Sequence, residues 1–173
     1  MKKLFILFIA VAGFGVSSFA QSSRTATGTS GATIILPLTI TAANPLEFGR
    51  IVPNGGGTVV ISADGTTKTY NTVQHAPGGA TPSAASFNVT GGTSAGFAIS
   101  LVNNTFLLQT GAGGANETMS VTPVLSASSG TLSGANPGLA SFTVGGTLTV
   151  GAAQASGVYT NSAGTFQVTV DYN

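Results

Sequence analysis

The chain has 173 residues, and only 5% of them are charged. Two of its five basic residues lie at the very start, so the other three face four acidic residues over the rest of the chain, a net charge of −1. That balance excludes the basic patch that nucleic-acid binding requires. A surface with so little charge favours association. Cysteine is absent, so core packing and backbone pairing must hold the fold without disulfides.

Residues 1–20 have the pattern of an export signal peptide. Lys2 and Lys3 form a basic start, an apolar run follows, and Ser18-Phe19-Ala20 is a small-residue cleavage site. The apolar run is too short to span a bilayer comfortably. No second such run follows, so we predict an exported protein, at the cell surface, in a fimbrium or extracellular, with no transmembrane segment in the mature chain.

The first predicted strand follows a polar stretch. Residues 21–31 are rich in Gly, Ser and Thr and lack periodicity, which predicts a flexible N-terminal leader. A domain is predicted over residues 32–173. Its first strand has an apolar face made of Ile34, Leu36, Leu38 and Ile40. Pro37 cannot donate a backbone hydrogen bond, which confines this strand to a sheet edge or to a junction where its partner changes.

Short alternating stretches, separated by turn residues, continue along the chain. Asp64-Gly65 between apolar alternations predicts a hairpin. Gly145-Gly146 indicates either a tight turn or a bulge in one long strand. Residues 126–138 are predicted to be a loop, and residues 151–164 lead to the final strand. Because no window has helical spacing, we predict an all-β antiparallel sandwich of about ten short strands.

The last stretch of the chain alternates most strictly. Its apolar face consists of Phe166, Val168, Val170 and Tyr172. A strand of this kind needs a neighbour at each edge, and one edge is left to be filled. The partner must come from earlier in this chain or from another molecule.

Residues that carry chemistry are sparse. His75 is the only histidine and has no nucleophile motif beside it, so a solvent-facing loop position is preferred to a catalytic role. The scattered acidic residues suggest neither a carboxylate pair nor a metal site. Tyr70 and Tyr159 could stack on a sugar, but packing within strands explains them better. We therefore predict no enzyme activity, no cofactor and no metal.

Two stretches together resemble a known family. Leu46-Glu47-Phe48-Gly49 follows the first strand, and Gly157-Val158-Tyr159-Thr160 precedes the final strand, Phe166-Gln167-Val168-Thr169-Val170-Asp171-Tyr172. Over residues 32–173 this pattern resembles exported bacterial proteins grouped as domain of unknown function 4402. It is similar, more distantly, to the spore coat protein U family of archaic chaperone–usher pilins.

The resemblance implies an immunoglobulin-like sandwich that lacks its last strand. In such pilins a periplasmic chaperone first fills the groove beside the C-terminal strand, and after transfer at an usher the N-terminal segment of the next subunit fills it. Carried onto this chain, the donor strand lies within residues 32–38, with contacts from Ala32, Ile34, Leu36 and Leu38. The acceptor groove is then lined by Phe166, Val168, Val170 and Tyr172. The polar leader and the missing cysteines depart from the pilin pattern.

Two functions follow from these observations. The first is a structural subunit of a bacterial surface fibre or pilus, assembled by strand addition into a homopolymer. The alternative is a self-complete, monomeric secreted β-sandwich that acts as a surface or matrix protein, with glycan binding as one form. Under the first, Pro37 divides the strand: residues up to about Leu36 serve a neighbouring subunit, and residues from Leu38 onward begin the chain's own sandwich.

Overall fold

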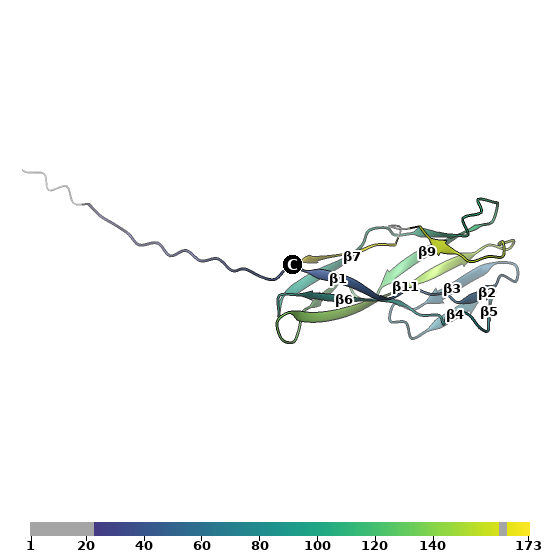
Figure 1. Cartoon of the computed structure of the whole chain (residues 1–173), viewed down its shortest axis with the longest axis horizontal. Helices are drawn as coiled ribbons and strands as arrows, with labels where there is room; N and C mark the ends of the chain where they lie inside the picture. The colour runs from purple at the N-terminus through teal and green to yellow at the C-terminus, as the bar shows by residue number, and fades with distance from the viewer. Residues whose placement is uncertain (1–22, 163–165) are drawn as a thin grey trace, which may run out of the picture. The chain divides into compact units, whose positions relative to one another are not determined.

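The structure is a computed structural model that describes residues 23–162 and 166–173. The predicted signal peptide, residues 1–20, lies outside the described residues. The chain divides into two units, Met1–Thr33 and Ile34–Asn173. Residues 23–33, the described part of the first unit, are exposed and have no regular secondary structure. The second unit is all-β (Figure 1), and nowhere in the described ranges is there a helix that could cross a membrane.

Two antiparallel sheets form a β-sandwich, which confirms the predicted fold class. The larger sheet has the strand order β1-β6-β11-β9-β8-β12, and β3 and β4 extend it beside β11. Its strands are β1 (Thr39–Asn44), β3 (Gly57–Ile61), β4 (Lys68–Asn71), β6 (Ala85–Gly91), β8 (Phe106–Gln109), β9 (Thr118–Leu125), β11 (Gly138–Val150) and β12 (Thr160–Asn161). The smaller sheet has the order β10-β7-β13. Its strands are β10 (Ser129–Thr131), β7 (Gly96–Leu101) and β13 (Val168–Tyr172). A separate two-stranded ladder joins β2 (Arg50–Val52) to β5 (Gln74–Ala76).

The strand order follows the immunoglobulin pattern. In that fold one sheet carries strands A, B, E and D, and the other carries C, F and G. Here β1-β6-β11-β9 take the positions of A, B, E and D, while β7 and β13 take those of C and F. Among the described residues no strand stands beside β13 in the position of G.

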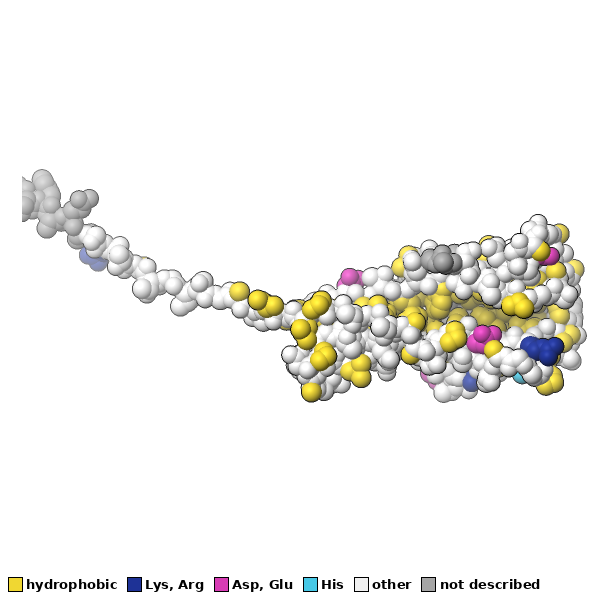
Figure 2. Space-filling view, viewed as in Figure 1, with side chains coloured by type: hydrophobic (Ala, Val, Ile, Leu, Met, Phe, Trp, Pro, Cys, Tyr) yellow, Lys and Arg dark blue, Asp and Glu magenta, His cyan; other side chains and the backbone are white. Residues whose placement is uncertain are grey.

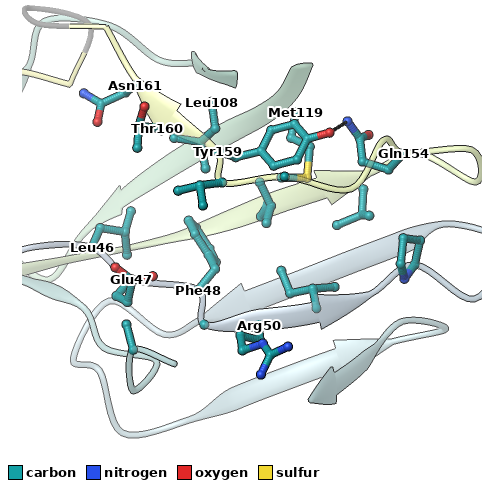
Figure 3. A pocket seen from close by; sticks show the side chains of 18 of the residues that line it. Leu46, Glu47, Phe48, Arg50, Leu108, Met119, Gln154, Tyr159, Thr160 and Asn161 are labelled. Carbon is teal, nitrogen blue, oxygen red and sulfur yellow. Dashed lines mark hydrogen bonds between the residues drawn. The ribbon is translucent and has the colours of Figure 1, made fainter. Parts of the chain in front are cut away.

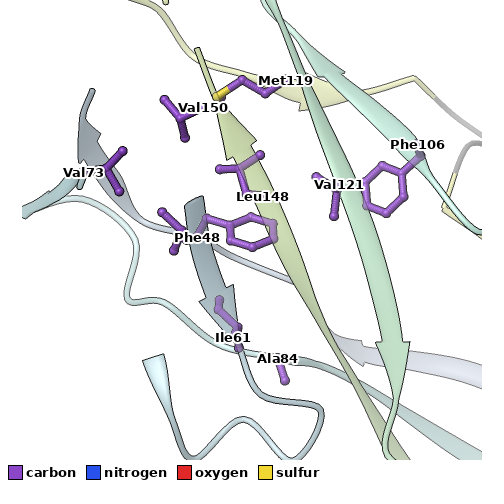
Figure 4. Packing of buried hydrophobic residues seen from close by; sticks show 10 residues of the cluster. Phe48, Ile61, Val73, Ala84, Phe106, Met119, Val121, Leu148 and Val150 are labelled. Atoms are coloured by element: carbon purple, nitrogen blue, oxygen red, sulfur yellow. The ribbon is translucent and has the colours of Figure 1, made fainter. Parts of the chain in front are cut away.

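The core consists of two clusters of buried apolar side chains. The first cluster lies around β3, β8, β9 and the second half of β11 (Figure 4). Its buried members are Phe48, Val59, Ile61, Val73, Ala84, Phe106, Met119, Val121, Leu148 and Val150. The second lies around β6, β7 and the first half of β11, and its buried members are Ala85, Val89, Phe97, Ile99, Leu132, Phe142 and Val144. Half-buried Leu46 and Phe166 pack against both clusters, so they join the two halves of the core.

The glycine pair Gly145-Gly146 lies inside one continuous strand, so the predicted turn is wrong. The inward face of β11 keeps its alternation through the pair and its pairing with β9 shows no register shift, so there is no bulge either. A Cβ atom on Gly145 would lie 2.3 Å from the carbonyl oxygens of Ile61 and Ser62. Glycine is needed there because a neighbouring backbone approaches the strand closely.

Of the other predicted elements, one hairpin is confirmed and several strand boundaries differ from the prediction. The Asp64-Gly65 hairpin is confirmed as the β3–β4 turn, where the Gly65 N–H donates to the Ser62 carbonyl oxygen at 2.8 Å. The strand expected from Ile34 begins only at Thr39, after Pro37. The predicted loop 126–138 contains the short strand β10, and the stretch that leads to the final strand contains the short strand β12. Neither strand has a local pattern, because each is ordered by pairing with a strand distant in the sequence.

Candidate functional site

One side of the sandwich is bordered by two strands with an unpaired edge. Within residues 23–162 and 166–173, β1 pairs only with β6, and β13 pairs only with β7. No ladder joins β1 to β13. Since both sheets end here, the core is covered on this side by side chains alone.

The free edge of β13 presents backbone groups that are ready to pair. The Val102 N–H donates to the Gln167 carbonyl oxygen at 3.1 Å, and the Asn173 N–H donates to the Gly96 carbonyl oxygen at 3.2 Å. Hydrogen-bonded residues alternate along an antiparallel ladder. Residues 169 and 171 therefore also face β7, whereas the N–H and C=O groups of residues 168, 170 and 172 point to the free edge. Residues 168, 170 and 172 were predicted to line a groove with their side chains. Their backbone groups also point towards that groove.

The predicted groove residues all face the core but remain half-buried. Phe166, Val168, Val170 and Tyr172 pack against the second cluster. The Phe166 ring stacks on Phe106 with centroids 5.0 Å apart and meets the edge of Phe87 at 6.2 Å. The structure therefore brings these four side chains to one side of the sandwich, where the alternation placed them.

A cavity of about 750 Å³ continues this side beyond β13. One wall comes from the segment Leu46 to Ile51, which follows β1, and the other from the segment Tyr159 to Asn161 (Figure 3). Figure 2 shows apolar side chains at the bottom of a hollow that lies near β2 to β5. Core residues form part of the lining, namely Phe48, Met119, Leu148 and Val150. We call the unpaired edges of β1 and β13, together with this cavity, the open groove.

Both walls of the cavity are held by hydrogen bonds. Glu47 and Ser83 exchange two backbone bonds of 2.9 Å, and Gly49 makes the bend between Phe48 and β2 at φ +76°. In the opposite wall the Tyr159 hydroxyl donates to the Ala155 carbonyl oxygen at 2.7 Å and accepts from Gln154 Nε2 at 2.9 Å. Each wall is therefore held by hydrogen bonds to a neighbouring segment of the domain.

The predicted donor residues lie in two different settings. Ala32, Ile34 and Leu36 are exposed, and Ile34 is 96% exposed. Leu38 is half-buried and packs against its own second cluster. The Tyr172 hydroxyl donates to the Leu36 carbonyl oxygen at 2.6 Å and accepts from the Gly92 N–H at 2.7 Å. The chain is thus tied to its own domain from Leu36 onward and is exposed before it.

Sequence reasoning did not find the cavity. Leu46-Glu47-Phe48-Gly49 was used only as a family motif, although its alternation indicated that Leu46 and Phe48 face inward. The opposite wall carries no such signal, because its place depends on the long-range pairing of β12 with β8.

His75, Tyr70 and Asp64 lie in β5, in β4 and in the β3–β4 turn, respectively. His75 is exposed within β5 and lies 5.3 Å, between ring centroids, from half-buried Tyr70. Burial raises the pKa of the Tyr70 phenol. No group of three potential metal ligands is found among the described residues. Hydrogen bonds from Ser62 and Thr66 lower the pKa of Asp64, but these bonds close the β3–β4 turn.

Comparison with known proteins places the chain in a family. Residues 38–172 match the family described as Domain of unknown function (DUF4402), so the chain belongs to that family. No curated protein and no solved structure matches it significantly.

Proposed function

We propose that this member of the DUF4402 family is a structural subunit of a bacterial surface fibre, assembled by strand addition. The observation that carries the proposal is the open groove: a sandwich with the position of strand G empty in the described residues, and a cavity that reaches the core. A strand from another copy of the chain would occupy that position. Export and display at the cell surface are part of the proposal.

Energetics favour an added strand over solvent in this position. A strand at the free edge of β13 would pair with the backbone groups of residues 168, 170 and 172, and each hydrogen bond contributes about 0.5–1.5 kcal/mol net. Burial of Ile34 would add roughly 1.5–3 kcal/mol, the contribution of one fully buried aliphatic side chain. An exposed strand edge beside apolar surface is also a liability that soluble monomers avoid.

The N-terminal segment has the properties of a donor strand. Residues 23–37 are exposed and have no strand partner of their own. The stretch 25–36 contains no charged residue, so it would place no charge against the core residues that form part of the cavity lining. Pro37 ends this segment one residue before the half-buried Leu38. Because the Leu36 carbonyl oxygen is bonded to Tyr172 of its own domain, we assign the segment before Leu36 to the neighbouring copy.

Partners follow from the same groove. A subunit with an empty strand position exposes apolar surface until another copy fills it, so a periplasmic chaperone that supplies a temporary strand is expected, with an usher that directs the exchange. The sequence motifs that resemble those of spore coat protein U pilins led us to the same partners.

The proposal is tested on the exported protein purified from its host. Denaturing gels of unboiled sample should show a ladder of multimers that collapses to one band on boiling, and gel filtration should show species larger than a monomer. The result that overturns the proposal is a chain that stays monomeric at high concentration and unfolds as one stable unit with no chaperone present.

One observation favours the alternative of a self-complete monomer. The bonds from Tyr172 hold Leu36 against its own domain, so the segment before it starts beside its own groove. If the segment fills its own groove, the denaturing gel of unboiled sample shows a single band, and the protein is a complete monomeric surface protein.

A further inference from the structure

The open groove has two unlike ends. At one end, the start of β1 lies beside the end of β6, because Thr39 pairs with Thr90, and the Tyr172 hydroxyl bonds the Gly92 N–H that follows β6. We call this the Tyr172 end. The cavity lies towards the opposite end, where β11 finishes at Val150, and no residue of β1 or β13 lines it. We call this the cavity end.

The two ends differ in the space that they offer. At the Tyr172 end, a Cβ atom on Gly91 would lie 2.4 Å from the Tyr172 hydroxyl oxygen and 3.1 Å from a Leu38 methyl group. The cavity end has about 750 Å³ of open volume against the first core cluster. The open volume that could take a large side chain therefore lies at the cavity end, whereas the Tyr172 end is closely packed around Gly91.

The donor segment has a matching gradient of side-chain size. In an extended chain, alternate residues face the same way. The face that contains Ile34 continues towards the N-terminus through small residues only, namely Ala32, Ser30, Gly28 and Ala26. Bulk is thus concentrated at the C-terminal end of the segment. From Ala26 to Ile34 the strand would span roughly 27 Å, at about 3.4 Å per residue.

Leu36 is unavailable as the large residue because its carbonyl oxygen is bonded to Tyr172 of its own domain. Ile34 is the nearest large side chain on that face that remains almost fully exposed. Only one residue separates it from Leu36, so the cavity end of one copy must abut the Tyr172 end of the next.

The direction of the donor strand follows from these two ends. β13 runs towards the Tyr172 end, where the segment before Leu36 leaves the domain. A segment that folded back into its own groove would run parallel to β13, with Ile34 beside the Tyr172 end. A segment that enters the cavity end of another copy runs antiparallel to β13.

We infer that Ile34 of the next copy is the anchor that enters the cavity and packs against the first core cluster, with Ala32, Ser30, Gly28 and Ala26 following antiparallel to β13. The inference rests on the proposed function and adds the register and the direction of the donor strand. It ends the donor at Ile35, so Leu36 and Leu38 belong to their own subunit.

Disulfide formation tests this register, because the chain has no native cysteine. The double variant Ile34→Cys/Leu46→Cys should give a ladder on non-reducing gels of boiled protein, since Leu46 lines the cavity. If the Leu46→Cys substitution itself prevents assembly, so that the reduced, unboiled sample shows no ladder, Leu108→Cys is used in its place, because Leu108 also lines the cavity. The matched control Ile34→Cys/Ile40→Cys has its second cysteine in β1 and should remain a single monomer band.

The outcomes separate the inference from the proposed function. A wild-type ladder without a cavity cross-link, or with a cross-link to position 40 instead, overturns the register and leaves the proposed function standing. A wild-type chain that forms no ladder overturns both. An intramolecular cross-link to position 40 identifies a segment folded into its own groove.

A size exchange provides a second test. The variant Ala32→Ile/Ile34→Ala keeps the composition of the segment but moves its bulk away from the cavity by two residues. The multimers should dissociate about tenfold faster or more, because affinity differences in related interfaces appear mainly in dissociation rates. The control Ile35→Ala alters the opposite face and should dissociate at close to the wild-type rate. Equal rates for wild type and the exchanged variant contradict the anchor.

Discussion

Two strands with the same alternating pattern, β11 and β13, differ in edge pairing and in the burial of their inward side chains. Residues 146–149 of β11 are paired on both sides, with β3 and β9, and the inward residues Val144 and Leu148 are 0% and 1% exposed. β13 is paired only with β7 in the described residues, and its inward residues are half-buried. Alternation therefore sets which way side chains point, whereas burial depends on whether a neighbouring strand closes the edge. Under our proposal, β13 is the strand that a second copy completes.

The largest effect is expected from a charge in the closed strand. Val144→Asp would place a carboxylate at a fully buried position of β11. It loses about 1.5–3 kcal/mol of burial and adds a penalty of several kcal/mol for the charge, against a total stability of about 5–15 kcal/mol. We expect no folded protein by circular dichroism or in the soluble fraction. A cooperative thermal transition near that of wild type would contradict the assignment of β11 as the core strand.

The same substitution in the open strand should leave a folded domain. Val168 is half-buried in β13, so Val168→Asp should cost about 1–2 kcal/mol in the isolated subunit. Its carboxylate would lie in the groove, so the ladder on unboiled gels should be lost. A variant that melts near wild type and still forms multimers would remove β13 from the interface.

A pair of proline substitutions sharpens the comparison at the level of the backbone. Thr169 faces β7, so Thr169→Pro removes a ladder hydrogen bond and should destabilise the subunit by about 1–3 kcal/mol. Val170 directs its N–H to the free edge, so Val170→Pro should cost the subunit less and weaken assembly more. Denaturant unfolding and unboiled gels measure the two effects. The reverse order would mean that another strand already covers the free edge.

The smallest effect is expected at Asp64, an exposed residue of the β3–β4 turn that belongs to neither strand. Hydrogen bonds from Ser62, then from Thr66, hold the pKa of Asp64 below its ordinary value of 3.8. A carboxyl whose folded pKa is lowered stabilises the fold above its unfolded pKa, and this contribution is lost as pH falls through the folded pKa. Asp64→Asn should therefore lower Tm slightly at neutral pH. Thermal melts below pH 3.8 should show a smaller difference from wild type, and a difference that grows on acidification would contradict this account.

Local patterns accounted for most of the fold and for part of the site. Alternation identified the inward face of β13, and Asp64-Gly65 identified a hairpin, because side-chain direction and turn geometry depend on residues close in sequence. Pro37 also marked the place where the N-terminal segment gives way to the domain. The assignment of Leu36 to the donor could not be judged in this way, since its bond to Tyr172 joins residues far apart in the chain.

The residue pattern is enough to predict an all-β sandwich, the inward faces of its strands and a surface with little charge. Three features became visible only in the folded chain: which strands are closed on both edges, the position of Gly145 against the backbone of Ile61 and Ser62, and the cavity between the Leu46 wall and the Tyr159 wall. The reason is physical: strand pairing joins residues with no local relation, and a neighbouring strand can be absent without any change in the pattern of the strand that lacks it.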